Sequence, residues 1–189
     1  MTESDFNQIL RQIGAGERAS SKLMDLLYAE LHAMADRLMR RERGDHTLQP
    51  TALVHEAFLR LVDAEQVGER GQLHFLDAAA VTMRRVLVDH ARRVGAAKRG
   101  GGARHDRVSL GAIGDGGGEA DVDILGLHVA LEELSRLDER QAKIVELRFF
   151  GGMSGDQIAE HMEISRSTVV RELTLARAWL RRQISKQEA

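Results

Sequence analysis

The chain has 189 residues, of which 43% are hydrophobic and only 4% aromatic, with one proline and no cysteine. This length suits one domain or two small ones, and a composition rich in Ala, Leu and Arg favours an all-α fold over a sheet. The lack of cysteine excludes disulfides and thiolate metal sites, which suits a reducing cytoplasm. The sequence shows no signal peptide and no apolar run of membrane length, so we expect a cytoplasmic protein without a membrane partner.

The formal net charge of −2 conceals a strong segregation of charge along the chain. Residues 84–107 carry eight Lys/Arg and two Asp, residues 108–134 carry six acids and no Lys/Arg, and residues 166–186 carry six Lys/Arg and one acid. Two basic segments therefore flank an acidic one. This arrangement favours a protein that contacts nucleic acid at two separate places.

Apolar periodicity predicts helices at residues 4–13, 20–43, 50–64 and 74–98 in the first half of the chain. Pro50 fits the first turn of the third helix, because that position needs no N–H donor. The fourth helix would bury an apolar stripe and expose four arginines, namely Arg84, Arg85, Arg92 and Arg93. Arginines spaced in this way can follow successive phosphates; a solvated basic surface is the alternative.

Residues 100–126 contain nine glycines, an acidic cluster and little apolar periodicity, which predicts a flexible linker. The linker would separate an N-terminal domain at 1–99 from a C-terminal domain at 127–189. Beyond it, residues 127–134 and 138–150 are expected to form the first two helices of the C-terminal domain. The fold class predicted is thus all-α, with two small helical domains.

The stretch from residue 154 to 182 encodes two capped helices joined by a short turn. Ser154 with Gln157 forms a capping-box pattern, and Ser165 repeats the cap eleven residues later, which leaves about three residues for the turn. This spacing is typical of a helix-turn-helix. The second helix would bury Val169, Leu173, Ala176 and Leu180 and expose Ser167, Arg171, Thr174 and Arg181. The last helix of an ordinary bundle is the alternative, but the paired caps favour DNA binding.

Four blocks in a fixed order resemble the sigma-70 family of bacterial RNA polymerase sigma factors. They are residues 48–61, residues 83–93 with Asp89-His90, the basic Gly-rich tail that follows, and the helix-turn-helix. With no extra domain between its two halves, the chain resembles the extracytoplasmic-function (ECF) subfamily, from about residue 4 to 185. The resemblance implies a promoter-recognition subunit that binds promoter DNA and the coiled coil and flap of core RNA polymerase. It implies no cofactor and no metal, and an anti-sigma protein is a further candidate partner.

The resemblance also implies roles for particular residues. Polymerase binding would fall to Leu53, His55, Glu56 and Arg60, where relatives usually carry a Gln-Glu pair in place of His55-Glu56. Recognition and melting of the minus-ten element would fall to Arg84, Arg85, Arg92 and Arg93, and recognition of the minus-thirty-five element to Arg166, Ser167, Arg171 and Thr174.

Three residues depart from the family pattern in the helix-turn-helix. Val170 and Glu172 occupy positions that are often basic in relatives, which predicts a weaker grip on the DNA backbone there. Glu163 replaces a common glycine of the turn, which predicts a turn without positive φ.

Enzyme motifs are not satisfied. His55-Glu56 lacks the second histidine of H-E-x-x-H, and residues 98–102 do not fit the phosphate-binding G-x-x-x-x-G-K-[ST] pattern. Two alternatives to a sigma factor remain open at this point. One is a dimeric helix-turn-helix regulator that works without polymerase, and the other is an interaction module that does not bind DNA.

Overall fold

The computed structural model describes residues 21–39, 48–62, 72–97, 107–109 and 121–187. The N-terminal helices are α2 (Ser21–Met39), α3 (Pro50–Val62) and α4 (Gln72–Ala97). After the short strands β1 (Arg107–Ser109) and β2 (Asp121–Asp123) come α5 (Ile124–Leu137), α6 (Glu139–Phe149), α7 (Gly155–His161) and α8 (Arg166–Gln187). The predicted all-α class is confirmed, whereas the helix predicted at residues 4–13 lies outside the described residues.

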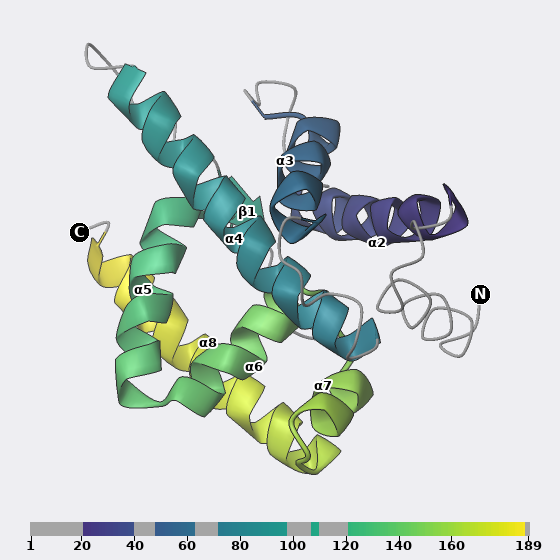
Figure 1. Ribbon diagram of the computed structural model, residues 1–189. Helices are drawn as coiled ribbons and strands as arrows, with labels where there is room; N and C mark the ends of the chain where they lie inside the picture. Colours follow the sequence, from purple (N-terminus) through teal and green to yellow (C-terminus); the bar gives the residue numbers. More distant parts are fainter. Residues whose placement is uncertain (1–20, 40–47, 63–71, 98–106, 110–120, 188–189) are drawn as a thin grey trace.

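Helix α4 runs obliquely across the molecule, with α2 and α3 on one side and α5 to α8 on the other (Figure 1). Its apolar residues lie in the common core, including Phe75, Ala79, Met83 and Val86, all at most 1% exposed. On α2, Leu27, Leu31, Met34 and Leu38 form one buried stripe. None of the described helices has both the length and the apolar character needed to cross a membrane.

Helix α3 begins at Pro50 as predicted. The Gln49 carbonyl accepts hydrogen bonds from the backbone N–H groups of Ala52 (3.0 Å) and Leu53 (3.1 Å), so the first turn closes without an N–H from proline. Leu53 and Val54 are neighbours on α3. Both are fully buried.

Part of the predicted linker has regular structure. Strands β1 and β2 pair antiparallel, with Arg107 opposite Asp123 and Ser109 opposite Asp121. Helix α5 begins at Ile124, inside the predicted linker range, because the Asp123 carboxylate accepts a hydrogen bond from the Gly126 N–H (2.9 Å) and caps the helix. The linker prediction considered glycine content and missed this cap. The division into domains at 1–99 and 127–189 stays a prediction.

The turn after α6 brings the two halves of the chain into close contact. Gly152 has a φ of +64°, and a side chain there would overlap the guanidinium of Arg37 on α2. A Cβ at Gly151 would lie 2.6 Å from the Leu147 carbonyl oxygen and 3.3 Å from the Cβ of Ala80 on α4. Close packing against backbone therefore requires glycine at position 151, whereas the positive φ favours glycine at position 152.

Candidate nucleic-acid interface

The helix-turn-helix starts with the capping box that the sequence predicts. The Gln157 N–H donates to the Ser154 hydroxyl (3.2 Å), and the Ser154 N–H donates to the Gln157 side-chain oxygen (2.9 Å). Four residues after α7 ends, the Ser165 hydroxyl accepts from the Thr168 N–H (3.1 Å) and caps α8. Two local caps therefore fix where both helices begin.

The turn between these helices contradicts one prediction. Glu163 has a φ of 54°, so the turn does require a left-handed residue. The Glu163 N–H bonds the Glu160 carbonyl (3.2 Å), and the Ile164 N–H bonds the Ala159 carbonyl (3.0 Å). This is a Schellman termination of α7, in which the left-handed residue lets the last carbonyls find donors. The requirement comes from the backbone path, so replacement of glycine by glutamate does not remove it.

The exposed side of α8 carries all four residues predicted to contact upstream DNA. The side chains of Arg166 and Arg171 are 69% and 66% exposed, and Ser167 and Thr174 are exposed between them. On the opposite side, Val169, Ala176 and Leu180 are fully buried as predicted, while Leu173 is only partly buried. The helix therefore presents a polar, cationic face near its capped N-terminus.

Glu172 does not lie on that exposed face, and the weaker grip on DNA expected at this position stays a prediction. It is 4% exposed, and its carboxylate accepts hydrogen bonds from Gln141 (2.8 Å), Arg171 (3.0 Å) and Arg140 (3.4 Å). Hydrogen bonds from Arg171 and then Gln141 lower the pKa of Glu172 despite its burial. Its place in the sequence, three residues after Val169 and four before Ala176, was the signal that it faces inward.

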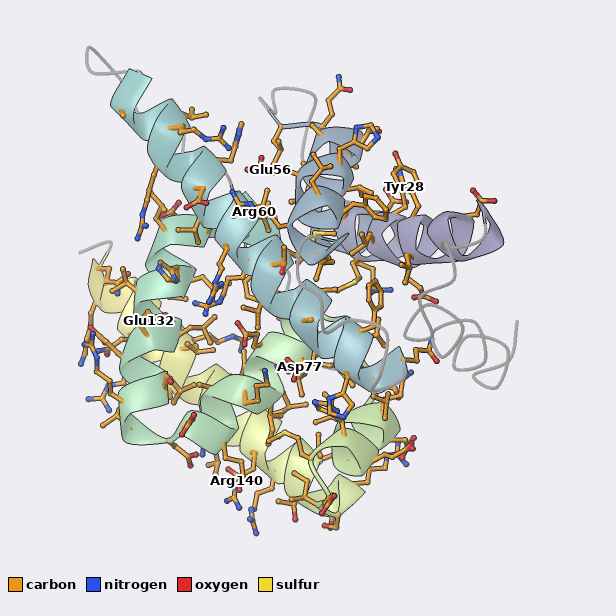
Figure 2. All side chains as sticks on the ribbon, viewed as in Figure 1. Tyr28, Glu56, Arg60, Asp77, Glu132 and Arg140 are labelled. Carbon is orange, nitrogen blue, oxygen red and sulfur yellow. The ribbon has the colours of Figure 1, made fainter. Side chains whose placement is uncertain are left out.

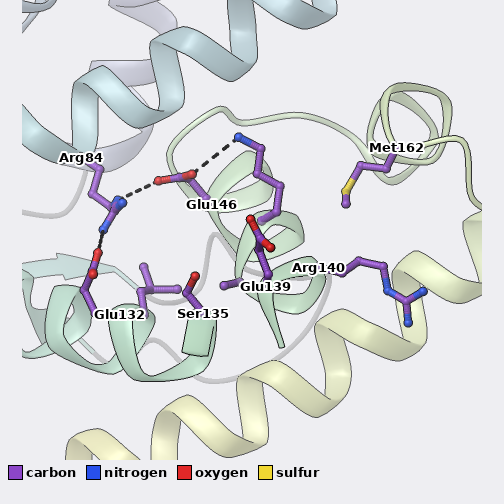
Figure 3. Close-up of a pocket in the computed structure, with 10 residues that line it drawn as sticks. Arg84, Glu132, Ser135, Glu139, Arg140, Glu146 and Met162 are labelled. Carbon is purple, nitrogen blue, oxygen red and sulfur yellow. Dashed lines mark hydrogen bonds and ion pairs between the residues drawn. The ribbon is translucent and has the colours of Figure 1, made fainter. Parts of the chain in front are cut away.

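The four arginines of α4 are not equivalent. Arg85, Arg92 and Arg93 are exposed, as predicted. The side chain of Arg84 is only 17% exposed, which corrects the prediction that it is displayed. It donates to Glu146 of α6 (2.7 Å) and to Glu132 of α5 (3.2 Å), and Figure 3 shows it between these two carboxylates. Periodicity within one helix could not reveal this contact, because the partners lie about 50 to 60 residues away in the sequence.

The contact of Arg84 is part of an ionic network between the halves. Its guanidinium lies 2.9 Å from Nδ1 of His128. Burial, followed by the charge of Arg84, lowers the pKa of His128, while the hydrogen bond from Arg84 lowers the pKa of Glu132. An open cavity of about 490 Å³ lies beside this network; it is lined by Arg84, Leu131, Glu132, Ser135, Glu139, Arg140, Ala142, Lys143, Glu146 and Met162.

A second ionic contact between the halves was missed by sequence reasoning. Asp77 of α4 pairs with Lys143 of α6 and, at 3.0 Å, with His161 of α7. The ring of His161 also packs edge-on against His74, with ring centres 4.9 Å apart. The helix-turn-helix is thereby fastened to the N-terminal end of α4.

The residues predicted to bind polymerase divide into one buried and three accessible side chains. Leu53 is fully buried and belongs to the core, so it cannot contact a partner directly. His55 is exposed and lies 3.0 Å from the Tyr28 hydroxyl. Glu56 and Arg60 pair at 2.7 Å on the side of α3 that faces α4 (Figure 2).

Glu56 and Arg60 also form ion pairs with α4, and the exposed Leu59 lies next to Arg60 in the sequence. Arg60 bonds Asp89 (3.1 Å), and Glu56 bonds Arg93 (3.3 Å). Leu59, 65% exposed on the same helix, was not predicted as a site residue. Its position four residues after His55 was the available signal.

These features define the class of a helical DNA-binding protein with a helix-turn-helix in its C-terminal half. The family model for the ECF sigma factor matches residues 3–186, and the chain therefore belongs to the ECF sigma factor family. As a member it binds RNA polymerase and directs promoter-specific transcription initiation, and this family is not a class of enzymes. No curated protein and no solved structure gave a match to the chain.

Proposed function

We propose that this sigma factor holds its promoter at two places, with α8 reading the minus-thirty-five element and α4 binding the minus-ten element. The observation that carries the proposal is the joint exposure of Arg166, Ser167, Arg171 and Thr174 at the start of α8. Side chains in this position of a helix-turn-helix reach base edges when the helix enters the major groove.

Arg171 is the main candidate for reading a base. Its side chain is exposed while one guanidinium nitrogen bonds the buried carboxylate of Glu172 at 3.0 Å. This contact limits the rotamers of Arg171 before DNA arrives, which reduces the entropy lost on binding. An arginine that bonds guanine in the major groove supplies about 1–3 kcal/mol of discrimination.

Helix α4 supplies the second contact through Arg85, Arg92 and Arg93. Separating bases at the minus-ten element costs a few kcal/mol, and cationic side chains that hold the separated strand offset this cost. Arg84 would join them only after it leaves Glu146 and Glu132. While Arg84 is bonded to Glu146 and Glu132, only three of the four arginines are available to DNA.

Polymerase would be bound by the exposed side of α3, through His55, Glu56 and Arg60 with Leu59 beside them. Leu53 contributes by holding the helix in the core. The partners proposed are the largest-subunit coiled coil and the flap of core polymerase, with an anti-sigma protein as a further partner. The site of action proposed is the cytoplasm, where RNA polymerase works.

The test is transcription by core polymerase with the purified chain on fragments of the host genome, followed by mapping of transcript starts. We expect starts preceded by a shared pair of elements. Arg171→Ala should change the sequences selected upstream, whereas Arg92→Ala should weaken binding without changing them. If the chain yields no promoter-dependent transcript while a housekeeping sigma factor does, the proposal is wrong.

A further inference from the structure

Val170 is an exposed apolar residue on the face of α8 that we propose enters DNA. It is 56% exposed. It follows Arg166 by four residues and Ser167 by three, and precedes Thr174 by four, so these four residues share one side of the helix. A single exposed valine needs no explanation on an ordinary surface. Here it lies among the proposed base contacts, where each group selects or rejects a base.

Thr174 adds a second apolar group in line with Val170. Its hydroxyl donates to the Val170 carbonyl oxygen at 2.8 Å. The hydroxyl hydrogen is therefore already used, and Thr174 can offer a partner only an acceptor oxygen and its methyl group. Four residues span about 6 Å along a helix, which is roughly two base-pair steps of DNA.

We propose that Val170 and Thr174 read the methyl groups of thymine in the upstream promoter element. Thymine is the base that carries a methyl group in the major groove, and apolar side chains recognise it by contact. The hydrogen-bonding groups of Arg166, Ser167 and Arg171 cannot detect that methyl. This inference rests on the proposed function, in which α8 enters the major groove.

The positive charge around Val170 and Thr174 favours duplex DNA as the partner that binds this face of α8. Residues 166–186 contain six Lys/Arg and one acid, and that acid, Glu172, is buried on the opposite side. A cationic rim around a small apolar strip complements phosphates that flank a thymine methyl. A purely apolar protein partner would cover Arg166 and Arg171 without offering them an anionic group.

The test uses the complete holoenzyme and a promoter library with a randomised upstream element. We expect thymine to be enriched at one or two positions. A selected promoter is then synthesised with deoxyuridine at each thymine in turn, which removes only the methyl group. With the unchanged chain, deoxyuridine at those positions should weaken promoter binding about three- to fivefold, as expected for removal of one buried methyl group.

Two variants assign the effect to the two side chains. Val170→Ala should bind the thymine promoter more weakly and lose the difference between thymine and deoxyuridine at one position. Thr174→Ser, which keeps the hydroxyl, should lose the difference between thymine and deoxyuridine at a second position, about two base-pair steps away. Val129→Ala is the matched control, because Val129 is a similarly exposed valine (48%) on another helix, α5; this variant should keep the full difference.

The outcomes separate this inference from the proposed function. If the holoenzyme transcribes normally but no deoxyuridine substitution matters, or both variants keep the difference, the thymine inference is wrong and the sigma-factor proposal stands. If no promoter-specific complex forms at all, the proposed function fails and the inference fails with it.

Discussion

Arg84 of α4 and Glu146 of α6 form a hydrogen-bonded ion pair at 2.7 Å, with side chains only 17% and 13% exposed. One end of the pair belongs to the helix proposed to bind the minus-ten element, and the other to the helical unit that carries the helix-turn-helix. The Glu146 carboxylate thus occupies a guanidinium that, under the proposed function, would bind a DNA phosphate. Under the proposed function, packing of the halves and binding of DNA would compete for the Arg84 side chain.

Glu146→Gln should weaken the packing of the two halves and release Arg84. Since the pair is largely shielded from water, we expect the free energy of unfolding to fall by about 1–3 kcal/mol. The affinity of the free chain for a single-stranded minus-ten oligonucleotide should rise a few-fold. Urea unfolding and fluorescence anisotropy measure the two effects. Glu139→Gln, an exposed acid beside the same cavity, should change neither; equal effects in both variants would disprove a specific role of Glu146.

Glu172→Gln should alter the pH dependence of stability. In the folded state the pKa of Glu172 lies below its ordinary value of 4.5, mainly because Arg171 donates to its carboxylate. Its stabilisation is therefore present above pH 4.5 and disappears as the pH falls through the lower folded-state pKa. We expect the variant to be less stable by about 1–3 kcal/mol at pH 7 and closer to the unchanged chain near pH 3.

Urea titrations of Glu172→Gln at both pH values give the measurement, with the exposed acid Glu160→Gln as the control. A stability difference that stays constant between pH 7 and pH 3 would show that the Glu172 charge is not its source.

Arg92→Ala and Arg93→Ala should reduce the salt dependence of promoter binding. For every phosphate that the protein no longer neutralises, the slope of log affinity against log salt falls by about 0.9 on duplex DNA or about 0.7 on a single strand. Arg136→Ala, an exposed arginine at the end of α5, is the control and should keep the slope. The slope is measured from promoter binding by the holoenzyme at salt concentrations between about 50 and 200 mM, where the effect of salt is large. An unchanged slope in the double variant would show that these α4 arginines do not bind DNA.

Glu163→Gly should stabilise the helix-turn-helix. Glu163 holds a left-handed conformation at φ 54°, which costs a residue with a Cβ about 1–2 kcal/mol. We expect a gain of about 1 kcal/mol, reduced by the greater freedom of glycine in the unfolded chain. Glu160→Gly, three residues earlier inside α7, should lose about 1 kcal/mol. Thermal unfolding of the two variants should shift in opposite directions, and a shift in the same direction would contradict the strain assigned to Glu163.

The helices and their caps were predictable because their signals are local. The spacing of Leu27, Leu31, Met34 and Leu38 fixes one face of α2, and Ser154 with Gln157 satisfies donors within a single turn. The errors arose where contacts between residues far apart in the sequence decide whether a side chain is exposed. Arg84 was predicted to be exposed, but its side chain is covered by α5 and α6. Leu53 was predicted to bind polymerase, but its side chain is buried in the core.

The remaining positions depend on geometry that residue type does not determine. Glu163 takes a left-handed conformation because the carbonyls of α7 need donors. The roles of the exposed residues toward DNA and polymerase stay predictions, since they depend on partners outside the chain.

The pairing of β1 with β2 also limits how far the halves can move apart. While Arg107 lies opposite Asp123, only residues 98–106 join α4 to the strand pair, and such a segment extends to at most about 30 Å. If the strands separate, residues 98–123 become available and the tether reaches roughly 90 Å. Promoter elements centred near −10 and −35 lie about 85 Å apart along the duplex, at roughly 3.4 Å per base pair. Under the proposed function, these three residue pairs would have to separate before the chain between α4 and α5 is long enough to span both elements.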